Sequence, residues 1–208
     1  MERSMRKAWE LSRRRREILK HAEKIFSSKG FHSATMAEIA GSSGYAIGTI
    51  YQIFQGKEHL YTTMVNEKMD RMYSEIRQSV IKARDVMDKI EALVSAHFRF
   101  VENNVDFCNL FIRGEAMTLS EGLAALRDKI IDDYLEHVKF IEEIIRDGLG
   151  VRFMRPMESR TIASALLGMI NAFALDWMVA PDDSPLSAKV GSVLDIFLQG
   201  VQQDGYQT

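Results

Sequence analysis

The sequence predicts an all-α protein. Its three prolines, Pro156, Pro181 and Pro185, all lie in the last third of the chain, so no proline interrupts the long segment before them. No segment shows sustained alternation of apolar and polar residues between turn dipeptides, as a strand would. Apolar residues instead recur three and four positions apart, which predicts about nine amphipathic helices.

Two short helices joined by a tight turn are predicted between residues 31 and 60. Thr35 and Glu38 have the spacing of a capping box, in which the threonine oxygen accepts a backbone N–H and the glutamate reaches back to the cap. Gly44 stands in the turn, where glycine tolerates positive φ. Two apolar residues four apart are expected to face inward from the second helix: Ile50 and Phe54. This is the helix-turn-helix pattern, whose second helix enters the DNA major groove.

The other helices follow from apolar spacing and end signals. A first helix ends near Gly30, and a helix that begins near Asp85 loses its pattern at Asn103. Ser120 is the predicted N-cap of a long helix that ends at Gly148 or Gly150. Ser184 and Pro185 predict the cap and first turn of the last helix. The remaining ranges are 57–83, a short helix around Phe107, about 157–180 and about 185–200.

Charge is distributed unevenly along the chain. The net charge is −2, but residues 1–62 carry a balance of +5 and residues 63–208 a balance of −7. The basic part includes a run of four arginines at 13–16, which is either a solvated face or an arm that meets phosphates. The overlap of this basic part with the helix-turn-helix favours DNA as the polyanion.

Several function classes are disfavoured. A single cysteine, Cys108, excludes an internal disulfide framework and a cysteine-based zinc site. The five histidines fall on different segments, and no glycine-rich phosphate loop or G-x-S-x-G motif occurs, so we expect no enzyme, no metal and no cofactor. The charged N-terminus has no apolar run behind it, which predicts no signal peptide and a cytoplasmic protein.

Residues 161–180 form the most apolar segment and allow two interpretations. Twenty mostly apolar residues could span a bilayer. Asn171 and Asp176 lie within the segment, however, and a carboxylate at that depth is costly. A helix that is apolar nearly all round also suits a buried subunit interface. We therefore expect an interface and no membrane span.

The stretch from Arg15 to Leu60 resembles the DNA-binding domain of the TetR family of bacterial transcriptional regulators. The matching segments are REILKHAEKIFSSKGF, TMAEIA, GYAIGTIYQIF and GKEHL. The C-terminal part is similar in its all-helical layout and in LGMINAFALDWM, which looks like the late interface helix of many members. The resemblance implies a helix-turn-helix DNA-binding domain at 1–56 and a ligand-binding and dimerisation domain at 57–208. Members are mostly homodimers, and most are repressors released by a small molecule.

The resemblance also assigns residues toward DNA. Gly48 would allow close approach to the backbone, Thr49 and Tyr51 match positions that touch phosphate, and Gln52 falls where a base contact is common. The full set expected to meet a palindromic operator is Thr35, Tyr45, Ala46, Ile47, Gly48, Thr49, Tyr51, Gln52 and Lys57. Two departures stand out: Ala46 replaces a usual capping Ser or Thr, and Ile47 replaces a usual Lys or Arg.

Polar residues on otherwise apolar helices are the candidates for an effector pocket, since a few convergent polar groups in an apolar cavity build ligand sites. Each is more often an ordinary buried or surface group. These candidates are His97, Arg99, Asn109, Arg113, Tyr134, Asn171 and Asp176. The expected partners are operator DNA, a small apolar effector, and a second copy of the chain through about 157–180 and 185–200. A ligand-independent DNA-binding or interaction module, and an activator of the same family, stay open as alternatives.

Overall fold

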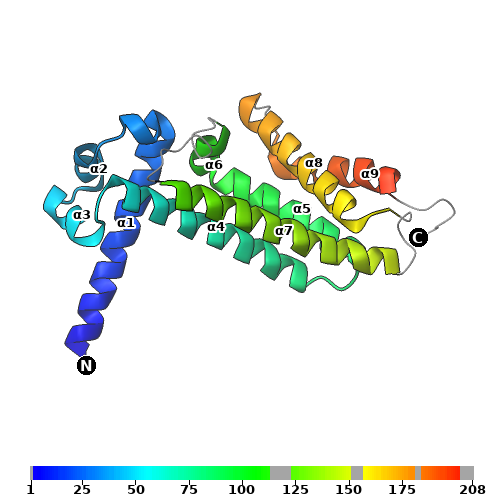
Figure 1. The fold of residues 1–208 in the computed structure, drawn as a ribbon, viewed down its shortest axis with the longest axis horizontal. Coiled ribbons are helices and arrows are strands. Elements are labelled where there is room, and N and C mark those ends of the chain that lie inside the picture. The colour runs from blue at the N-terminus through cyan, green and yellow to red at the C-terminus, as the bar shows by residue number, and fades with distance from the viewer. Residues whose placement is uncertain (1, 113–122, 151–156, 181–183, 202–208) are drawn as a thin grey trace. The chain divides into compact units, whose positions relative to one another are not determined.

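The computed structural model describes residues 2–112, 123–150, 157–180 and 184–201, and the secondary structure of these residues is entirely helical, as predicted (Figure 1). The predicted cap Ser120 lies outside them. The helices are α1 Glu2–Ser33, α2 Met36–Ser43, α3 Ile47–Ile53, α4 Lys57–Ile81, α5 Val86–Asn103, α6 Val105–Ile112, α7 Ala124–Gly150, α8 Ser159–Val179, the 3-10 helix η2 Leu186–Lys189, and α9 Val190–Val201.

The chain forms two compact units. The first, which we call the head, comprises Met1–Met69 and Asp106–Asp128, and the second, the body, comprises Asp70–Val105 and Lys129–Thr208. Helices α4 and α7 each begin in the head and continue along the chain into the body. The domain boundary at residue 56, which the sequence placed just before α4, stays a prediction.

An aromatic cluster joins α1 to α4 inside the head. The Phe26 ring meets the Tyr61 ring edge-on at 5.0 Å between centroids, and the Phe31 ring lies 5.0 Å from the same tyrosine. Helix α1 is interrupted where the sequence predicted its end, because Gly30 takes a non-helical φ of 80°. The expected inward residues of α3, Ile50 and Phe54, are both buried in this core.

The body has one apolar core built from α4, α5, α7, α8, η2 and α9. Ile90, Leu93 and Val94 on the apolar face of α5 are fully buried there. One expectation differs from the structure. The last helix begins at Val190 rather than at Pro185, because Pro185 keeps an extended ψ of 148° and the 3-10 turn η2 follows it.

Helix α8 is the segment for which a membrane span was weighed. By length and composition alone it could cross a bilayer, and a third of its most apolar window is buried inside the protein. One side of α8 packs into the core of the body through residues such as Ile162, Leu166 and Ile170. The helix therefore has one face in the core of the body and a second face that is exposed.

Candidate nucleic-acid interface

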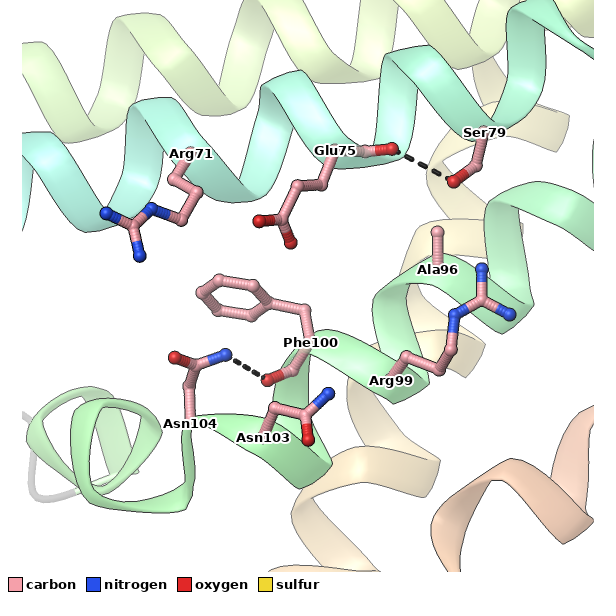
Figure 2. A pocket seen from close by; sticks show the side chains of 8 residues that line it. All are labelled: Arg71, Glu75, Ser79, Ala96, Arg99, Phe100, Asn103 and Asn104. Carbon is pink, nitrogen blue, oxygen red and sulfur yellow. Dashed lines mark hydrogen bonds between the residues drawn. The ribbon is translucent and has the colours of Figure 1, made fainter.

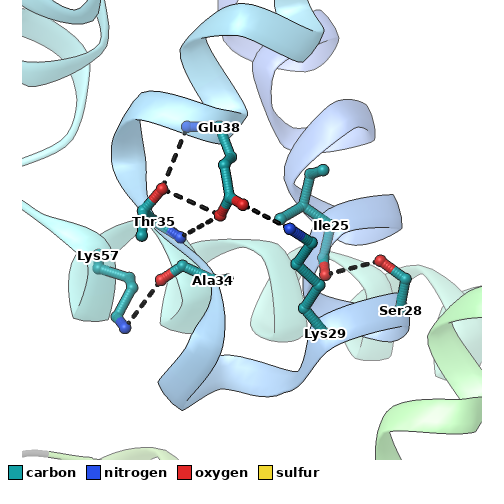
Figure 3. Close-up of polar contacts among 7 residues, drawn as sticks. All are labelled: Ile25, Ser28, Lys29, Ala34, Thr35, Glu38 and Lys57. Atoms are coloured by element: carbon teal, nitrogen blue, oxygen red, sulfur yellow. Dashed lines mark hydrogen bonds and ion pairs between the residues drawn. The ribbon is translucent and has the colours of Figure 1, made fainter.

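The entry to α2 is fixed by the predicted capping box (Figure 3). The Glu38 backbone N–H donates to Thr35 Oγ1 at 3.2 Å, and the Thr35 backbone N–H donates to Glu38 Oε2 at 3.0 Å. Lys29 Nζ donates to the other carboxylate oxygen, Glu38 Oε1, at 2.5 Å. The hydrogen bonds from Lys29 and Thr35 lower the pKa of Glu38, so the carboxylate stays ionised at the helix N-terminus, where negative charge is favoured.

The turn between α2 and α3 is anchored to α1. Gly44 ends α2 in the left-handed conformation, with φ 73° and ψ 14°, as the sequence predicted. Tyr45, which follows it, donates its hydroxyl hydrogen bond to the Glu17 carboxylate on α1, and this bond raises the pKa of Tyr45. His21 on α1 also bonds through Nδ1 to Ser42 Oγ at 2.8 Å. These contacts hold α1 and the turn as one rigid frame.

Helix α3 has one buried and one open face. Ile50 is fully buried, whereas Ile47 is 44% exposed and Tyr51 is 52% exposed. Gly48 and Gln52 are exposed as well, and the four open positions occupy adjacent places on the helix surface. Thr49 is half-buried beside them. Ala46 occupies the N-cap position but forms no capping hydrogen bond, because its methyl side chain has no acceptor atom. The open face is short, uncharged and free to meet a surface outside the head.

Lys57 begins α4 and is tied to the end of α1 (Figure 3). Its Nζ donates to the backbone carbonyl of His32 at 3.1 Å and to that of Ala34 at 3.0 Å, and it lies 4.7 Å from the centre of the Phe31 ring. Because an ammonium has three donors, one N–H remains for another acceptor. Lys57 thus has a positioning role in the head that its place in the motif did not reveal.

The arginine run divides between one residue that contacts the head and three that are exposed to solvent. Arg15 forms an ion pair with Glu67 on α4 and lies 5.9 Å from the centre of the Phe54 ring, so it supports the head. Arg13, Arg14 and Arg16 are exposed. The exposed three are the part of the run that is available to a polyanion.

A groove on the body lies between α4 and α5 (Figure 2). It has a volume of about 360 Å³ and a largely polar lining, in which Arg71 and Glu75 come from α4 and Arg99 from α5. The Asn104 side-chain amide donates to the Phe100 carbonyl at 2.7 Å at one end of the groove. No ion pair is formed by Arg71 or Arg99 with another residue of the described ranges. The groove therefore presents two guanidinium groups that could hold an anion.

A second groove of about 340 Å³ lies between α4 and α7. Tyr73 and Arg77 line it from α4, and Asp133, Glu136 and His137 line it from α7. His137 is nonetheless only 2% exposed. Sequence reasoning did not select His137, although its spacing of four from Ile141 already places it on the apolar face of α7.

The seven predicted effector residues are not gathered at one site. His97 is buried in the body, and Arg99 lines the groove between α4 and α5. Asn109 belongs to the head. Three others are exposed: Tyr134, Asn171 and Asp176. Arg113 lies outside the described residues. Helical spacing shows which face a residue occupies, but the assignment of those faces to one cavity depends on packing between helices.

Comparisons with known proteins identify the class of protein. The family described as bacterial regulatory proteins, tetR family, matches residues 18–64, and the family described as YsiA-like protein, C-terminal region, matches residues 65–200. Together with the helix-turn-helix head, these matches define a DNA-binding transcription regulator and not an enzyme. The chain belongs to the TetR family.

Individual relatives agree with this assignment. The transcriptional activator FasR of Mycolicibacterium smegmatis is 30% identical over 86% of this chain and 80% of its own length. The fatty acid metabolism regulator protein of Bacillus subtilis is 23% identical over 89% of this chain and 94% of its own. The solved fatty acid degradation regulator FadR from Bacillus halodurans is 25% identical, with a TM-score of 0.76 over 90% of this chain and 95% of that one. FadR from Bacillus subtilis, solved in complex with stearoyl-CoA, has a TM-score of 0.74 at 20% identity over 89% of this chain and 98% of that one.

Proposed function

We propose that this regulator is a cytoplasmic homodimeric repressor that binds a palindromic operator and is released by a small-molecule effector. The observation that carries the DNA part is the open face of α3, where Ile47, Gly48, Tyr51 and Gln52 are exposed on a helix that the capped α2 and the anchored turn hold in place. Two such helices would read half-sites about 34–36 Å apart, or somewhat more.

The individual contacts follow from the side chains on this face. Gln52 can bond bidentately to an adenine, and Ile47 can pack on a thymine methyl group. Tyr51 and Thr49 have hydroxyl groups that can donate to phosphates. The N–H that Lys57 leaves unused can reach a phosphate from the start of α4. Direct base reading would thus come from two neutral side chains, and the exposed arginines of α1 would supply charge.

The test is operator binding by the Tyr51→Ala variant. Fluorescence anisotropy against DNA from upstream of the protein's own gene should show affinity weakened at least about tenfold, which is about 1.4 kcal/mol. Because Tyr51 is exposed, circular dichroism of the variant should match that of the unaltered protein. Tyr134→Ala removes a similarly exposed tyrosine from the body and serves as the control, with affinity unchanged in the absence of effector. Equal affinity for all three proteins would show that α3 is not the recognition helix.

The homodimer part rests on the open face of α8. Five small or apolar residues form one exposed stripe along the helix: Ala165, Gly168, Ala172, Leu175 and Val179. Ile196 on α9 is 55% exposed as well. Exposed apolar surface of this kind marks interaction sites, and the same patch on two copies can form a two-fold interface. We therefore place the dimer contact on α8 and α9.

The effector part rests on the body and on the relatives. A relative with this fold was solved with stearoyl-CoA, so a fatty acyl thioester is the effector class we propose. Its anionic groups would suit the two arginines of the groove between α4 and α5, and its chain would enter the apolar core beneath. Because α4 is one continuous helix from Lys57 to Ile81, binding in the body would shift it and so change the state of the head. Stearoyl-CoA should lower operator affinity at fixed salt, and unchanged affinity would refute the switch.

A role as an activator is the second candidate. The relative FasR is described as a transcriptional activator and is 30% identical to this chain. The sign of regulation depends on where the operator lies relative to the promoter. A reporter gene behind the upstream DNA decides between the two: repression predicts higher expression when the regulator is deleted, and activation predicts lower expression.

A further inference from the structure

Two histidines face each other inside the body. His97 on α5 and His137 on α7 are 7% and 2% exposed, and their Nε2 atoms lie 2.9 Å apart. His97 Nδ1 lies 2.7 Å from the backbone carbonyl oxygen of Leu93, one turn earlier on α5. Burial lowers the pKa of His97 to about 4 and that of His137 to about 3, so both rings are neutral at physiological pH.

The hydrogen-bond chain determines where each proton sits. A carbonyl oxygen only accepts, so His97 Nδ1 must carry the proton that it donates to Leu93. In a neutral ring the other nitrogen, His97 Nε2, is then an acceptor. The 2.9 Å contact between the two rings therefore needs a proton on His137 Nε2. His137 is left with an unprotonated Nδ1, which is an acceptor.

That last acceptor has no partner. His137 Nδ1 is buried and makes no hydrogen bond to any residue of the described ranges. A buried polar atom without a partner is costly and calls for an explanation such as a bound molecule. His97 occupies the Nε2 side of the ring, and the same ring lines the groove between α4 and α7. The groove is therefore the opening beside this ring through which a ligand could approach Nδ1.

The surroundings of the ring disfavour an anionic partner at this point. Tyr73 packs on the His137 ring at 4.8 Å between centroids, and burial raises the pKa of this tyrosine, which keeps it neutral. Lys129 bridges the groove carboxylate Asp133, at 2.7 Å, and Asp70, at 3.3 Å. The Arg77 guanidinium lies 4.6 Å from the centre of the Phe140 ring, and Glu136 is exposed at the rim. An anion would meet both the lone pair of Nδ1 and the neighbouring carboxylates.

We propose that the groove between α4 and α7 is a ligand site in which His137 Nδ1 accepts a hydrogen bond from a neutral hydroxyl or amide N–H group, with the ring of Tyr73 beside it. The proposal rests on the proposed function only in that the groove belongs to the effector-binding body. It states which chemical group a ligand must present there: a donor, and neither an anion nor an ether. His97 acts as a positioning residue, because its bond to Leu93 determines which tautomer His137 adopts.

The experiment compares two probes that differ in one donor. Phenol and anisole have the same ring, but only phenol can donate a hydrogen bond. In the full-length protein with ¹⁵N-labelled histidine, the His137 Nδ1 resonance should show an unprotonated nitrogen, and phenol should shift it toward the hydrogen-bonded position. Anisole should leave it unchanged. A protonated Nδ1 in the free protein, or equal responses to the two probes, would overturn the proposal.

A substitution of His137 tests the role of its Nδ1 atom in a protein that still folds. His137→Gln places an amide N–H where Nε2 donates to His97 and removes Nδ1. We expect it to fold and to bind phenol about fivefold more weakly, the factor that an ordinary net hydrogen bond provides. His32→Gln makes the same change at an exposed histidine of the head and should leave phenol binding unaltered. Phenol affinity that is equal in all three proteins would overturn the assignment of Nδ1.

The probe-binding experiment can succeed or fail independently of the proposed regulatory function. Probe binding is observed at His137 itself, without DNA or stearoyl-CoA. If phenol binds as expected but the operator is never released by any ligand, the site stands and the regulatory switch fails. If stearoyl-CoA releases the operator while His137 responds to neither probe, the switch stands and the site assignment fails.

Discussion

Gly48 allows a test in which stability and DNA binding move in opposite directions. It is the second residue of the seven-residue helix α3, and it is exposed. A Cβ added at this position meets no atom within 4 Å, so nothing inside the head requires a glycine there. Glycine inside a helix is less favourable than alanine by roughly 0.5–1 kcal/mol. A residue that costs stability without an internal reason points to a partner that needs the space.

The Gly48→Ala variant should therefore be more stable and bind DNA less well. We expect a gain of about 0.5 kcal/mol, the lower end of the range because Gly48 lies in the first turn of α3. Hydrogen exchange of the head amides should slow by about twofold, since a gain of 1.4 kcal/mol would correspond to tenfold. Operator affinity, measured by anisotropy, should fall at least about tenfold, because the new methyl group keeps the DNA backbone away from α3.

Gly41 provides the matched control. It lies inside α2, is exposed, and a Cβ added there also meets no atom within 4 Å. Gly41→Ala should stabilise the head by about 1 kcal/mol without weakening operator binding. The reasoning is refuted if Gly48→Ala binds the operator as tightly as the unaltered protein, or if both variants weaken binding equally.

Three further predictions concern the cap, the buried histidines and the dimer. Thr35→Ala should destabilise the head by about 1 kcal/mol, and Thr35→Ser should restore it, as measured by hydrogen exchange of the α2 amides. Burial lowers the pKa of His97 and His137, so the folded protein keeps both rings unprotonated, whereas the unfolded chain protonates them below about pH 6.5. The free energy of unfolding should therefore fall as the pH drops from about 6.5 toward about 4. The expected slope is about 1.4 kcal/mol per pH unit for each histidine. Urea titrations across this range check the sign, and a midpoint independent of pH would contradict it. Ala172→Arg should convert the dimer to a monomer in light scattering, whereas Ala125→Arg, on the exposed surface of α7, should not.

Local signals explain what could be predicted about the head. The capping box of Thr35 and Glu38 and the left-handed Gly44 each depend on residues within three or four positions, so the sequence contains the whole interaction. Helical periodicity likewise assigned Ile50 and Phe54 to the core, and the structure buries both. The resemblance to the TetR family then followed from the same stretch of chain.

Long-range contacts explain what could not be predicted. Lys57 was assigned to phosphate from its place in the motif, but its bonds to His32 and Ala34 join residues 25 and 23 positions apart. The arginine run looked uniform, yet Arg15 alone reaches Glu67. Tyr134 was a candidate for the effector pocket, and packing left it exposed to solvent. Each outcome depends on how two helices meet, which periodicity within one helix does not contain.

The amino-acid sequence was sufficient to predict an all-α fold, a helix-turn-helix in the basic N-terminal part and membership of the TetR family, because these properties depend on short-range spacing and on a motif in continuous register. Which polar groups meet in the body could be learned only from the packing of the helices. His97 and His137 are 40 residues apart, and although the sequence made His97 a pocket candidate, only the packing of α5 against α7 shows that the two rings meet. A hydrogen-bond partner is set by position in space, and the fold determines that position.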